Sequence, residues 1–273
     1  MFEWLTGATR LFAILGDPIA QVRSPEIVTS ALQARGINGI LLPVHVTPDA
    51  FDDVMAGLKR IENLDGLILT LPYKARGLGH VDSLGREAMA GGVINAVRRG
   101  LDGSWHGEMF DGLGCIAAMA AAGVSPAGKR VLLIGAGGAG AAIALAVAGK
   151  RPAHLRIAEI DDDRATALVK RIAAIESDLP VDLGPADPTG FDLVINASPM
   201  GMADCPESPL LRPVTASTTV FDVVAKPNET LLMASALANG AMAIGGAEMI
   251  RGQVNMIADF FAQAKLDDEK DWI

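Results

Sequence analysis

Lys74 is the first residue whose type and position could support catalysis. It follows the apolar run LILTL at 67–71 and Pro72. Because proline cannot continue a strand ladder, the lysine is expected at the mouth of a buried strand. An ammonium there could hydrogen-bond a reacting oxygen and relay a proton, although lysines also lie at strand ends simply to reach water. Its role depends on what else converges on it.

A glycine-rich segment, GAGGAG at 135–140, supplies a second chemical motif. It has the spacing GxGxxG, follows the strand-like RVLLI and opens an apolar helix. In dinucleotide-binding folds the first glycine allows a tight turn, the second admits the pyrophosphate, and the third lets helix and strand pack closely. The helix N-terminus then offers amides to the phosphates. The predicted dinucleotide loop comprises Gly135, Ala136, Gly137, Gly138, Ala139 and Gly140.

Acidic residues end the next apolar run, in AEIDDDR at 158–164. A carboxylate about 20 residues beyond the fingerprint accepts hydrogen bonds from the adenosine ribose and repels a 2′-phosphate. Glu159 and Asp161 are the candidates, and the sequence leaves open which one faces the ribose. NAD is therefore the expected cofactor. NADP is the alternative, because Arg164 in the same segment could hold a phosphate.

Composition narrows the class of protein. Half of the 273 residues are hydrophobic and the formal net charge is −9, which argues against nucleic acid or an anionic membrane as the partner. The uncharged stretch 131–149 is as long as a short membrane span, but it occurs once and its glycines cluster at one end. The two cysteines lie far apart and the four histidines show no ligand spacing, so neither a disulfide nor a metal site is expected. These features predict a cytoplasmic protein with a small-molecule substrate.

Apolar runs alternate with helical patterns along the chain. Strands are predicted at 10–16, 40–46 and 65–71, and a second series begins near 129. Such an alternation predicts an α/β fold with mainly parallel sheets covered by helices. The break between the two series is expected near 112–125.

Several motifs, in this order, resemble those of the shikimate/quinate dehydrogenase family. They are GDPIAQVRSP (16–25), LTLPYK (69–74), AGGVINAV (90–97), FDGLG (110–114), GAGGAG, VINASPMGM (194–202) and GQVNMIADFF (252–261). The resemblance implies a mainly parallel α/β substrate domain at 1–113 and a Rossmann domain at 114–245. It also implies a C-terminal helix, within 246–273, that packs back on the first domain.

The resemblance also assigns roles to individual residues. It implies that Lys74 and Asp111 form the catalytic pair, and it leaves open which of them is the formal base. Alternatives remain for the substrate-binding positions: Asn95 as a turn residue, Gln253 on a helix surface, and Ser24 as a helix N-cap. The implied substrate-binding residues are Ser24, Thr70, Asn95 and Gln253. The further implied cofactor-binding residues are Asn196, Ser198, Pro199 and Val223.

Departures from the family pattern replace polar groups with apolar ones. They fall on Val22, Ile68, Met109, Phe110 and Ala225. The expected function is hydride transfer between NAD(P) and a cyclic hydroxy acid of the shikimate/quinate type, as in aromatic amino acid biosynthesis, with weak activity on shikimate itself. The alternatives are a dehydrogenase of an unrelated, less polar alcohol and a non-catalytic nucleotide sensor. A monomer or homodimer is expected.

The assignment of Lys74 can be tested by mutation. We expect Lys74→Ala to lower kcat by about 10²–10⁴-fold, a typical contribution of general acid–base catalysis, with little change in NAD affinity. Asp111→Asn should behave similarly. Steady-state kinetics on the best substrate found would measure both. Wild-type kcat in either variant would show that the pair is wrongly assigned.

Overall fold

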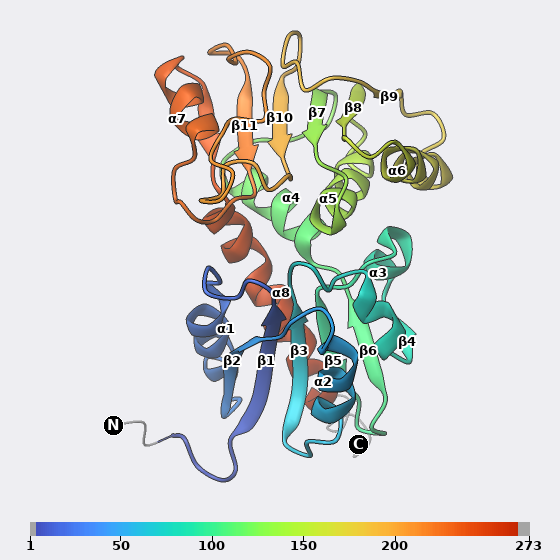
Figure 1. Cartoon of the computed structure of the whole chain (residues 1–273), viewed down its shortest axis with the longest axis vertical. Coiled ribbons are helices and arrows are strands. Elements are labelled where there is room, and N and C mark those ends of the chain that lie inside the picture. Colours follow the sequence, from blue (N-terminus) through green and yellow to red (C-terminus); the bar gives the residue numbers. More distant parts are fainter. Residues whose placement is uncertain (1–3, 267–273) are drawn as a thin grey trace. The chain divides into compact units, whose positions relative to one another are not determined.

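The computed structural model describes residues 4–266, which form two compact units. The first contains residues 4–110 and 254–266, and the second contains residues 111–253. Each has its own six-stranded sheet (Figure 1). Within residues 4–266, every helix is too short or too polar to cross a lipid bilayer.

The sheet of the first unit has the strand order β2-β1-β3-β5-β6-β4. Strands β1, β2 and β3 are parallel, as predicted, whereas β5 runs antiparallel to both β3 and β6. The strands are β1 (Arg10–Gly16), β2 (Gly39–His45), β3 (Leu64–Leu69), β4 (Ser83–Leu84), β5 (Ala96–Arg99) and β6 (Trp105–Glu108). The helices before residue 110 are α1 (Ser24–Gln33), α2 (Phe51–Leu58), the 3-10 turn η1 (Arg76–His80) and α3 (Arg86–Gly91).

The C-terminal helix α8 (Gly246–Leu266) contributes its later residues to the first unit. The Phe261 ring packs against Phe12 of β1 in a tilted arrangement with ring centroids 4.8 Å apart, and both side chains are buried. Gly66 in β3 leaves the space that the Phe261 ring fills. This packing is the return of the C-terminal helix that the family resemblance implies.

The sheet of the second unit has the order β12-β11-β10-β7-β8-β9, and all its pairings are parallel. When the strands are numbered from β7 and read from β9 to β12, this is the order 3-2-1-4-5-6 of the Rossmann fold. The strand order reverses between β7 and β10. The strands are β7 (Arg130–Ile134), β8 (His154–Ala158), β9 (Val181–Leu183), β10 (Leu193–Asn196), β11 (Thr219–Asp222) and β12 (Met242–Ile244). The helices are α4 (Asp111–Ala121), α5 (Gly138–Ala148), α6 (Asp162–Ile175) and α7 (Leu231–Ala238).

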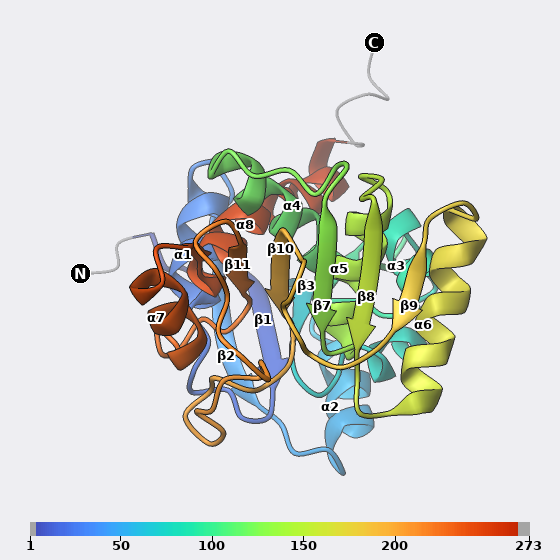
Figure 2. The same cartoon turned by 90° about the horizontal axis from the view of Figure 1, so that it is seen from above.

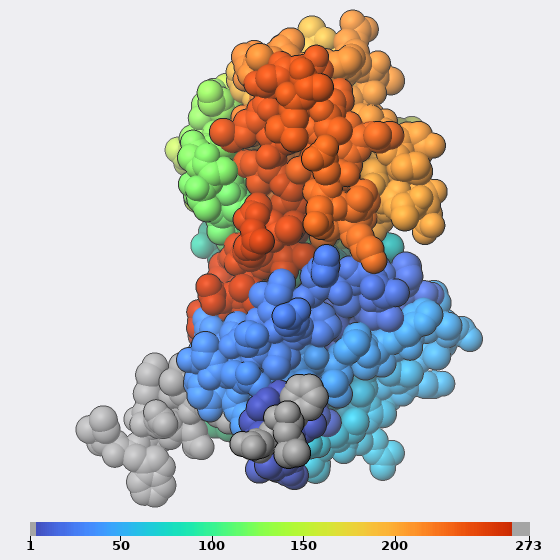
Figure 3. Space-filling model, turned by 90° about the vertical axis from the view of Figure 1, so that its left-hand side faces the viewer, coloured from blue at the N-terminus to red at the C-terminus, as the bar shows by residue number. Residues whose placement is uncertain are grey.

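Helices flank this second sheet along its whole width. α6 lies at the β9 end of the row of strands and α7 at the β11 end (Figure 2). Leu232 and Ala236 of α7 pack with Val194 and Val220 in a buried core cluster. The surface of this unit in Figure 3 is formed mostly by the chain after β10, drawn in orange and red.

The longer predicted elements are present, with ends within a few residues of the prediction. The short strands β4, β5, β6, β9 and β12 and the short helix α3 were not predicted. Charged and polar residues such as Arg98, Arg99 and His106 interrupt the apolar pattern of β5 and β6. The charged sequence LDDEKDWI at 266–273 predicts a solvated tail, and this segment lies almost wholly outside the described residues.

The contact between α8 and β3 can be tested at Gly66. A Cβ atom there would lie 2.6 Å from Phe261 Cε1 and 3.1 Å from Phe12 Cδ1, in a packed interior. We expect Gly66→Ala to lower the free energy of unfolding by about 1–3 kcal/mol, measured by denaturant titration. Gly57→Ala is the matched control, because nothing lies within 4 Å of a Cβ in that helical position. It should stabilise by up to about 1 kcal/mol, and equal effects of the two changes would contradict the packing argument.

Candidate functional site

The dinucleotide loop lies between β7 and α5, as predicted. Gly135 has φ +90, a left-handed conformation that favours glycine, and a Cβ there would lie 2.9 Å from the Ser198 amide nitrogen. A Cβ at Gly140 would collide with the Gly135 carbonyl, so the third glycine is needed for helix–strand packing. Gly137, the N-cap of α5, has open space where its Cβ would point. The loop therefore meets the three geometric demands of a pyrophosphate site.

Glu159 lies at the end of β8 with its side chain turned toward this loop. Its Oε2 accepts a hydrogen bond of 2.6 Å from the Ala136 N–H. Its Oε1 accepts bonds of 2.8 Å from the Ile160 N–H and 3.1 Å from the Asp161 N–H. The side chain is only 5% exposed. A carboxylate fixed in this way beside Ala136, the second residue of the fingerprint, is in the place where the ribose hydroxyls are expected.

Asp161 has a different local task. It is the N-cap of α6, and its Oδ1 accepts a 3.0 Å bond from the Arg164 N–H. The Arg164 guanidinium lies 3.6 Å from Glu159 and 3.2 Å from Asp161, so its charge is shared between the two acids. This geometry favours Glu159 over Asp161 as the acid that meets a ribose, a choice that the sequence left open.

The loops after β10 and β11 are tied together by buried polar groups. Asn196 is fully buried, and its Nδ2 donates to the Met200 carbonyl at 2.9 Å and to Asp222 Oδ1 at 3.0 Å. Its Oδ1 accepts from the Ser198 N–H at 3.1 Å and from the Ser198 hydroxyl at 2.7 Å. The Val223 N–H donates to the Asn196 carbonyl at 2.9 Å. Asn196, Ser198 and Val223 thus form one network, and Pro199 lies in the same loop; their contact with a cofactor stays a prediction.

Asp111 opens α4 and is 3% exposed. The glycines that follow it let α4 approach its neighbours: a Cβ at Gly112 would collide with the Ala142 carbonyl of α5. A Cβ at Gly114 would lie 2.8 Å from the Cβ of Gln253 in α8, and one at Gly252 2.5 Å from the Gly114 carbonyl oxygen. Close helix packing therefore brings Asp111 and Gln253 onto neighbouring helices.

In the first unit, two of the predicted substrate residues, Thr70 and Asn95, and the predicted catalytic Lys74 lie where β3 ends and β5 begins. The Thr70 N–H donates to the Leu15 carbonyl at 3.0 Å, at the end of β1. Lys74 accepts a 2.9 Å bond at its carbonyl from the Ile94 N–H, directly before Asn95. The Asn95 side chain is buried, and its Oδ1 accepts from the Phe110 N–H at 2.9 Å. Thr70, Lys74 and Asn95 thus lie at one edge of this sheet, while Asp111 belongs to the second unit.

Ser24 is the first residue of α1 and not its N-cap, which is Arg23. The alternative role of Ser24 as an N-cap is therefore wrong, because the helix begins one residue earlier than that role requires. Val22, in the preceding loop, is half-buried. Ile68 is 6% exposed and lies in β3 between Ile14 of β1 and Ala96 of β5.

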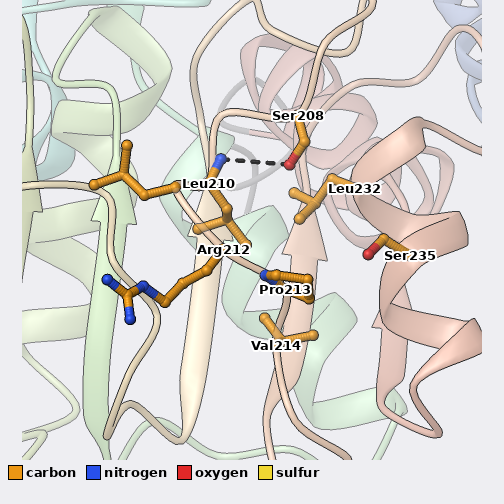
Figure 4. A pocket seen from close by; sticks show the side chains of 8 residues that line it. Ser208, Leu210, Arg212, Pro213, Val214, Leu232 and Ser235 are labelled. Carbon is orange, nitrogen blue, oxygen red and sulfur yellow. Dashed lines mark hydrogen bonds between the residues drawn. The ribbon is translucent and has the colours of Figure 1, made fainter.

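A separate hollow of about 210 Å³ opens beside α7 and contains none of the predicted site residues (Figure 4). Its Ser208 hydroxyl accepts a 3.3 Å bond from the Leu210 N–H. The Arg212 guanidinium pairs with Asp187, 3.1 Å away.

Within residues 4–266, no group of three or more histidine, cysteine or acidic residues is arranged to hold a metal ion.

One functional candidate was missed in the sequence. Asp222 ends β11, is fully buried, and bonds Asn196, Val224 and Thr230. The signal was an aspartate directly after Val220 and Phe221, inside the strand-like stretch TTVFDVV.

The comparisons with known proteins agree on one family. Residues 14–97 match the model of the shikimate dehydrogenase substrate binding domain. The shikimate dehydrogenase (NADP(+)) of Geobacter metallireducens is 32% identical over 260 residues, which are 91% of this chain and 90% of that protein.

Solved structures extend the likeness to both units. Shikimate 5-dehydrogenase from Listeria monocytogenes, in complex with shikimate and NAD, aligns with a TM-score of 0.84 at 25% identity, covering 100% of this chain and 99% of that one. Quinate dehydrogenase from Corynebacterium glutamicum, in complex with NAD, gives 0.82 at 25% identity, with coverage of 93% and 94%. The 5-ketofructose reductase of Gluconobacter gives 0.79 at 27% identity, with coverage of 94% and 97%.

The two α/β units and the glycine-rich loop define a dehydrogenase with a substrate domain and a Rossmann-like domain. The chain belongs to the shikimate/quinate dehydrogenase family. It is an oxidoreductase that acts on CH–OH groups.

The geometry of Glu159 generates a test of cofactor choice. A 2′-phosphate about 4 Å from a carboxylate is repelled by roughly 4 kcal/mol at an effective dielectric constant of 20, so NAD should bind at least about tenfold more tightly than NADP. Glu159→Gln should reduce this preference about tenfold. Asp161→Asn, which keeps the helix cap, is the matched control and should change the preference less than about threefold. Calorimetric titration of both nucleotides measures it, and equal or tighter NADP binding by the wild type would show that Arg164 dominates.

Proposed function

We propose that this protein transfers a hydride between NAD and a secondary alcohol carbon of a cyclic hydroxy acid, or of a less polar relative of one. The proposal rests on the position of Lys74, which follows β3 and lies beside Thr70 and Asn95. The same chain also contains the complete dinucleotide loop GAGGAG. NADP is the alternative cofactor, because the Geobacter relative is a shikimate dehydrogenase (NADP(+)).

The residues of the second unit fit a dinucleotide. The open space at Gly137 admits a pyrophosphate, and the first turn of α5 offers backbone amides to its oxygens. Glu159 is placed to accept hydrogen bonds from ribose hydroxyls. A bound nicotinamide supplies one function, which is to accept or donate the hydride.

The proton must be handled by the chain itself. We assign this to Lys74 and Asp111 as a pair, as the family resemblance implies. The Lys74 ammonium donates a hydrogen bond to the reacting oxygen and stabilises the negative charge that develops on it. In the pair that the resemblance implies, the Asp111 carboxylate would orient the ammonium. Thr70, Asn95, Ser24 and Gln253 would hold the substrate hydroxyls and carboxylate.

Substrate recognition is where this chain departs from its family. Val22 and Ile68 carry no hydrogen-bonding group at two positions where the family pattern has polar side chains. The fold also serves a 5-ketofructose reductase, so it is not confined to shikimate and quinate. These observations support weak activity on shikimate itself and a physiological substrate with fewer polar contacts at these two positions.

Two other functions compete with this proposal: a dehydrogenase of an unrelated alcohol and a nucleotide-binding sensor. A screen of shikimate, quinate and related alcohols with NAD and NADP, followed by the absorbance of the reduced cofactor, separates them. Turnover confined to alcohols unlike shikimate and quinate would favour the first. Nucleotide binding without turnover of any alcohol would favour the second. Cytoplasmic location and a monomeric or homodimeric state stay predictions.

The apolar replacement at Val22 generates a quantitative test. A hydroxyl that bonds a charged carboxylate contributes roughly 1.5–3 kcal/mol, so Val22→Ser should lower the KM for shikimate by about tenfold or more. Val22→Ala is the matched control, because it changes size without adding a hydroxyl, and it should leave KM nearly unchanged. Initial rates over a shikimate series measure the effect.

Two outcomes would contradict the proposal at Val22. An unchanged KM in a folded Val22→Ser variant would show that this position does not face the carboxylate. Efficient wild-type turnover at micromolar shikimate would show that other groups already bind it. Ile68→Asn is a weaker test, because Ile68 is buried within β3 and an amide there could destabilise the sheet.

A further inference from the structure

Asp222 is a buried carboxyl group that the proposed chemistry does not use. It ends β11, and none of its surface is exposed. Removing a carboxylate from water is costly unless hydrogen bonds replace the lost hydration. A buried carboxyl group therefore needs hydrogen-bond donors, and these donors identify the segments that it fixes in place.

Each oxygen of Asp222 has donors within hydrogen-bonding distance. Oδ1 accepts from the Asn196 side-chain amide at 3.0 Å and from the Val224 N–H at 3.1 Å. Oδ2 accepts from the Thr230 hydroxyl at 2.6 Å. Burial raises the pKa of Asp222 above its ordinary value, and these three bonds act in the opposite direction. One side chain thus joins the last residue of β10, the backbone after β11 and the N-cap of α7.

The hydrogen bond from Asn196 connects Asp222 to the loop after β10. Through the same side chain, Asn196 bonds Ser198 and Met200. Thr230 in turn caps α7 by accepting a 3.2 Å bond from the Met233 N–H. The shape of residues 196–200 therefore depends on Asp222 through one intermediate residue.

The place of this network in the sheet gives it a function. Dinucleotides bind across the carboxyl ends of the strands where the strand order reverses, here between β7 and β10. Glu159 directly follows β8, and the adenosine half of the nucleotide is expected beside it. The other half of the nucleotide must then lie over the ends of β10 and β11, beside residues 196–200 and 223–224.

We propose that Asp222 is a positioning residue that holds the loops after β10 and β11 in the shape that receives the nicotinamide half of the dinucleotide. This inference rests on the proposed function for the presence of the dinucleotide. Asp222 acts through Asn196 and the Val224 backbone and does not itself meet the nucleotide.

The test uses two probes on the full chain: NADH, which carries both halves, and ADP, which lacks the nicotinamide half. We expect Asp222→Ala to weaken NADH binding at least tenfold, by fluorescence titration, and to leave ADP affinity within twofold, by calorimetry. Asp222→Asn should keep NADH affinity within threefold. Its Oδ1 can still accept from Asn196 and Val224, and its amide can donate to a reoriented Thr230 hydroxyl.

Thr218→Val is the matched control. Thr218 is a buried polar residue directly before β11, and its hydroxyl donates to the Phe191 carbonyl at 3.1 Å. It lies at the opposite end of the same strand from Asp222. This change should lower thermal stability and leave the affinities for both NADH and ADP unchanged.

Hydrogen exchange provides a readout that needs no nucleotide. In Asp222→Ala, the amides of Ser198 and Val224 should exchange at least tenfold faster. The Gly135 amide, which bonds the Ala158 carbonyl at 2.8 Å, should exchange as in the wild type. Failure of the wild type to bind NADH would refute the proposed function, whereas this exchange pattern would still decide whether Asp222 shapes the loops.

Several outcomes would overturn the inference. They are equal losses of NADH and ADP affinity in Asp222→Ala, an Asn variant as impaired as the Ala variant, and unchanged exchange at Ser198 and Val224. If Asp222→Ala does not fold, Thr230→Val removes one of the same three bonds. It should weaken NADH binding at least threefold with ADP unchanged, and wild-type NADH affinity in that folded variant would also refute the proposal.

Discussion

Close backbone packing around α4 is the constraint on which the functional residues of the second unit depend. Gly112 lets α4 meet α5, and Gly114 with Gly252 lets it meet α8. Gly140 does the same between α5 and β7. Because a single methyl group would separate these elements, the positions of Asp111, Gln253 and the dinucleotide loop are set by contacts that tolerate no side chain.

Two buried carboxylates in this unit, those of Glu159 and Asp222, are both satisfied by hydrogen bonds. Glu159 and Asp222 both lie at strand ends, and backbone or side-chain donors meet the oxygens of both. The Glu159 bonds hold its carboxylate beside the Ala136 N–H of the dinucleotide loop. The Asp222 bonds are wholly internal, so they shape loops instead. The two carboxylates differ because Asp222 is fully buried and bonds Asn196 at the end of β10.

In the first unit, backbone hydrogen bonds fix the segments that carry Thr70, Lys74 and Asn95. Thr70, Lys74 and Asn95 are held by backbone bonds between β1, β3 and the start of β5, which do not depend on the side chains at 22 and 68. Polar recognition groups can therefore be lost there without disturbing the position of Lys74. Under the proposed function, the substrate could therefore differ from shikimate while Lys74 keeps its role.

The sequence by itself determined the long elements, the dinucleotide loop and the candidate residues around Lys74, because these depend on local periodicity, glycine spacing and ordered motifs. It did not reveal β5 and β6, since four-residue strands with Arg98, Arg99 and His106 lack a periodic signal. Only the tertiary structure showed that Asp161 caps a helix while Glu159 faces the loop, and that Ser24 begins α1 without capping it. It alone also joined Asp222 to Asn196 and Thr230, because the partners of a buried carboxylate are chosen by strand order and loop packing, which no stretch of sequence contains.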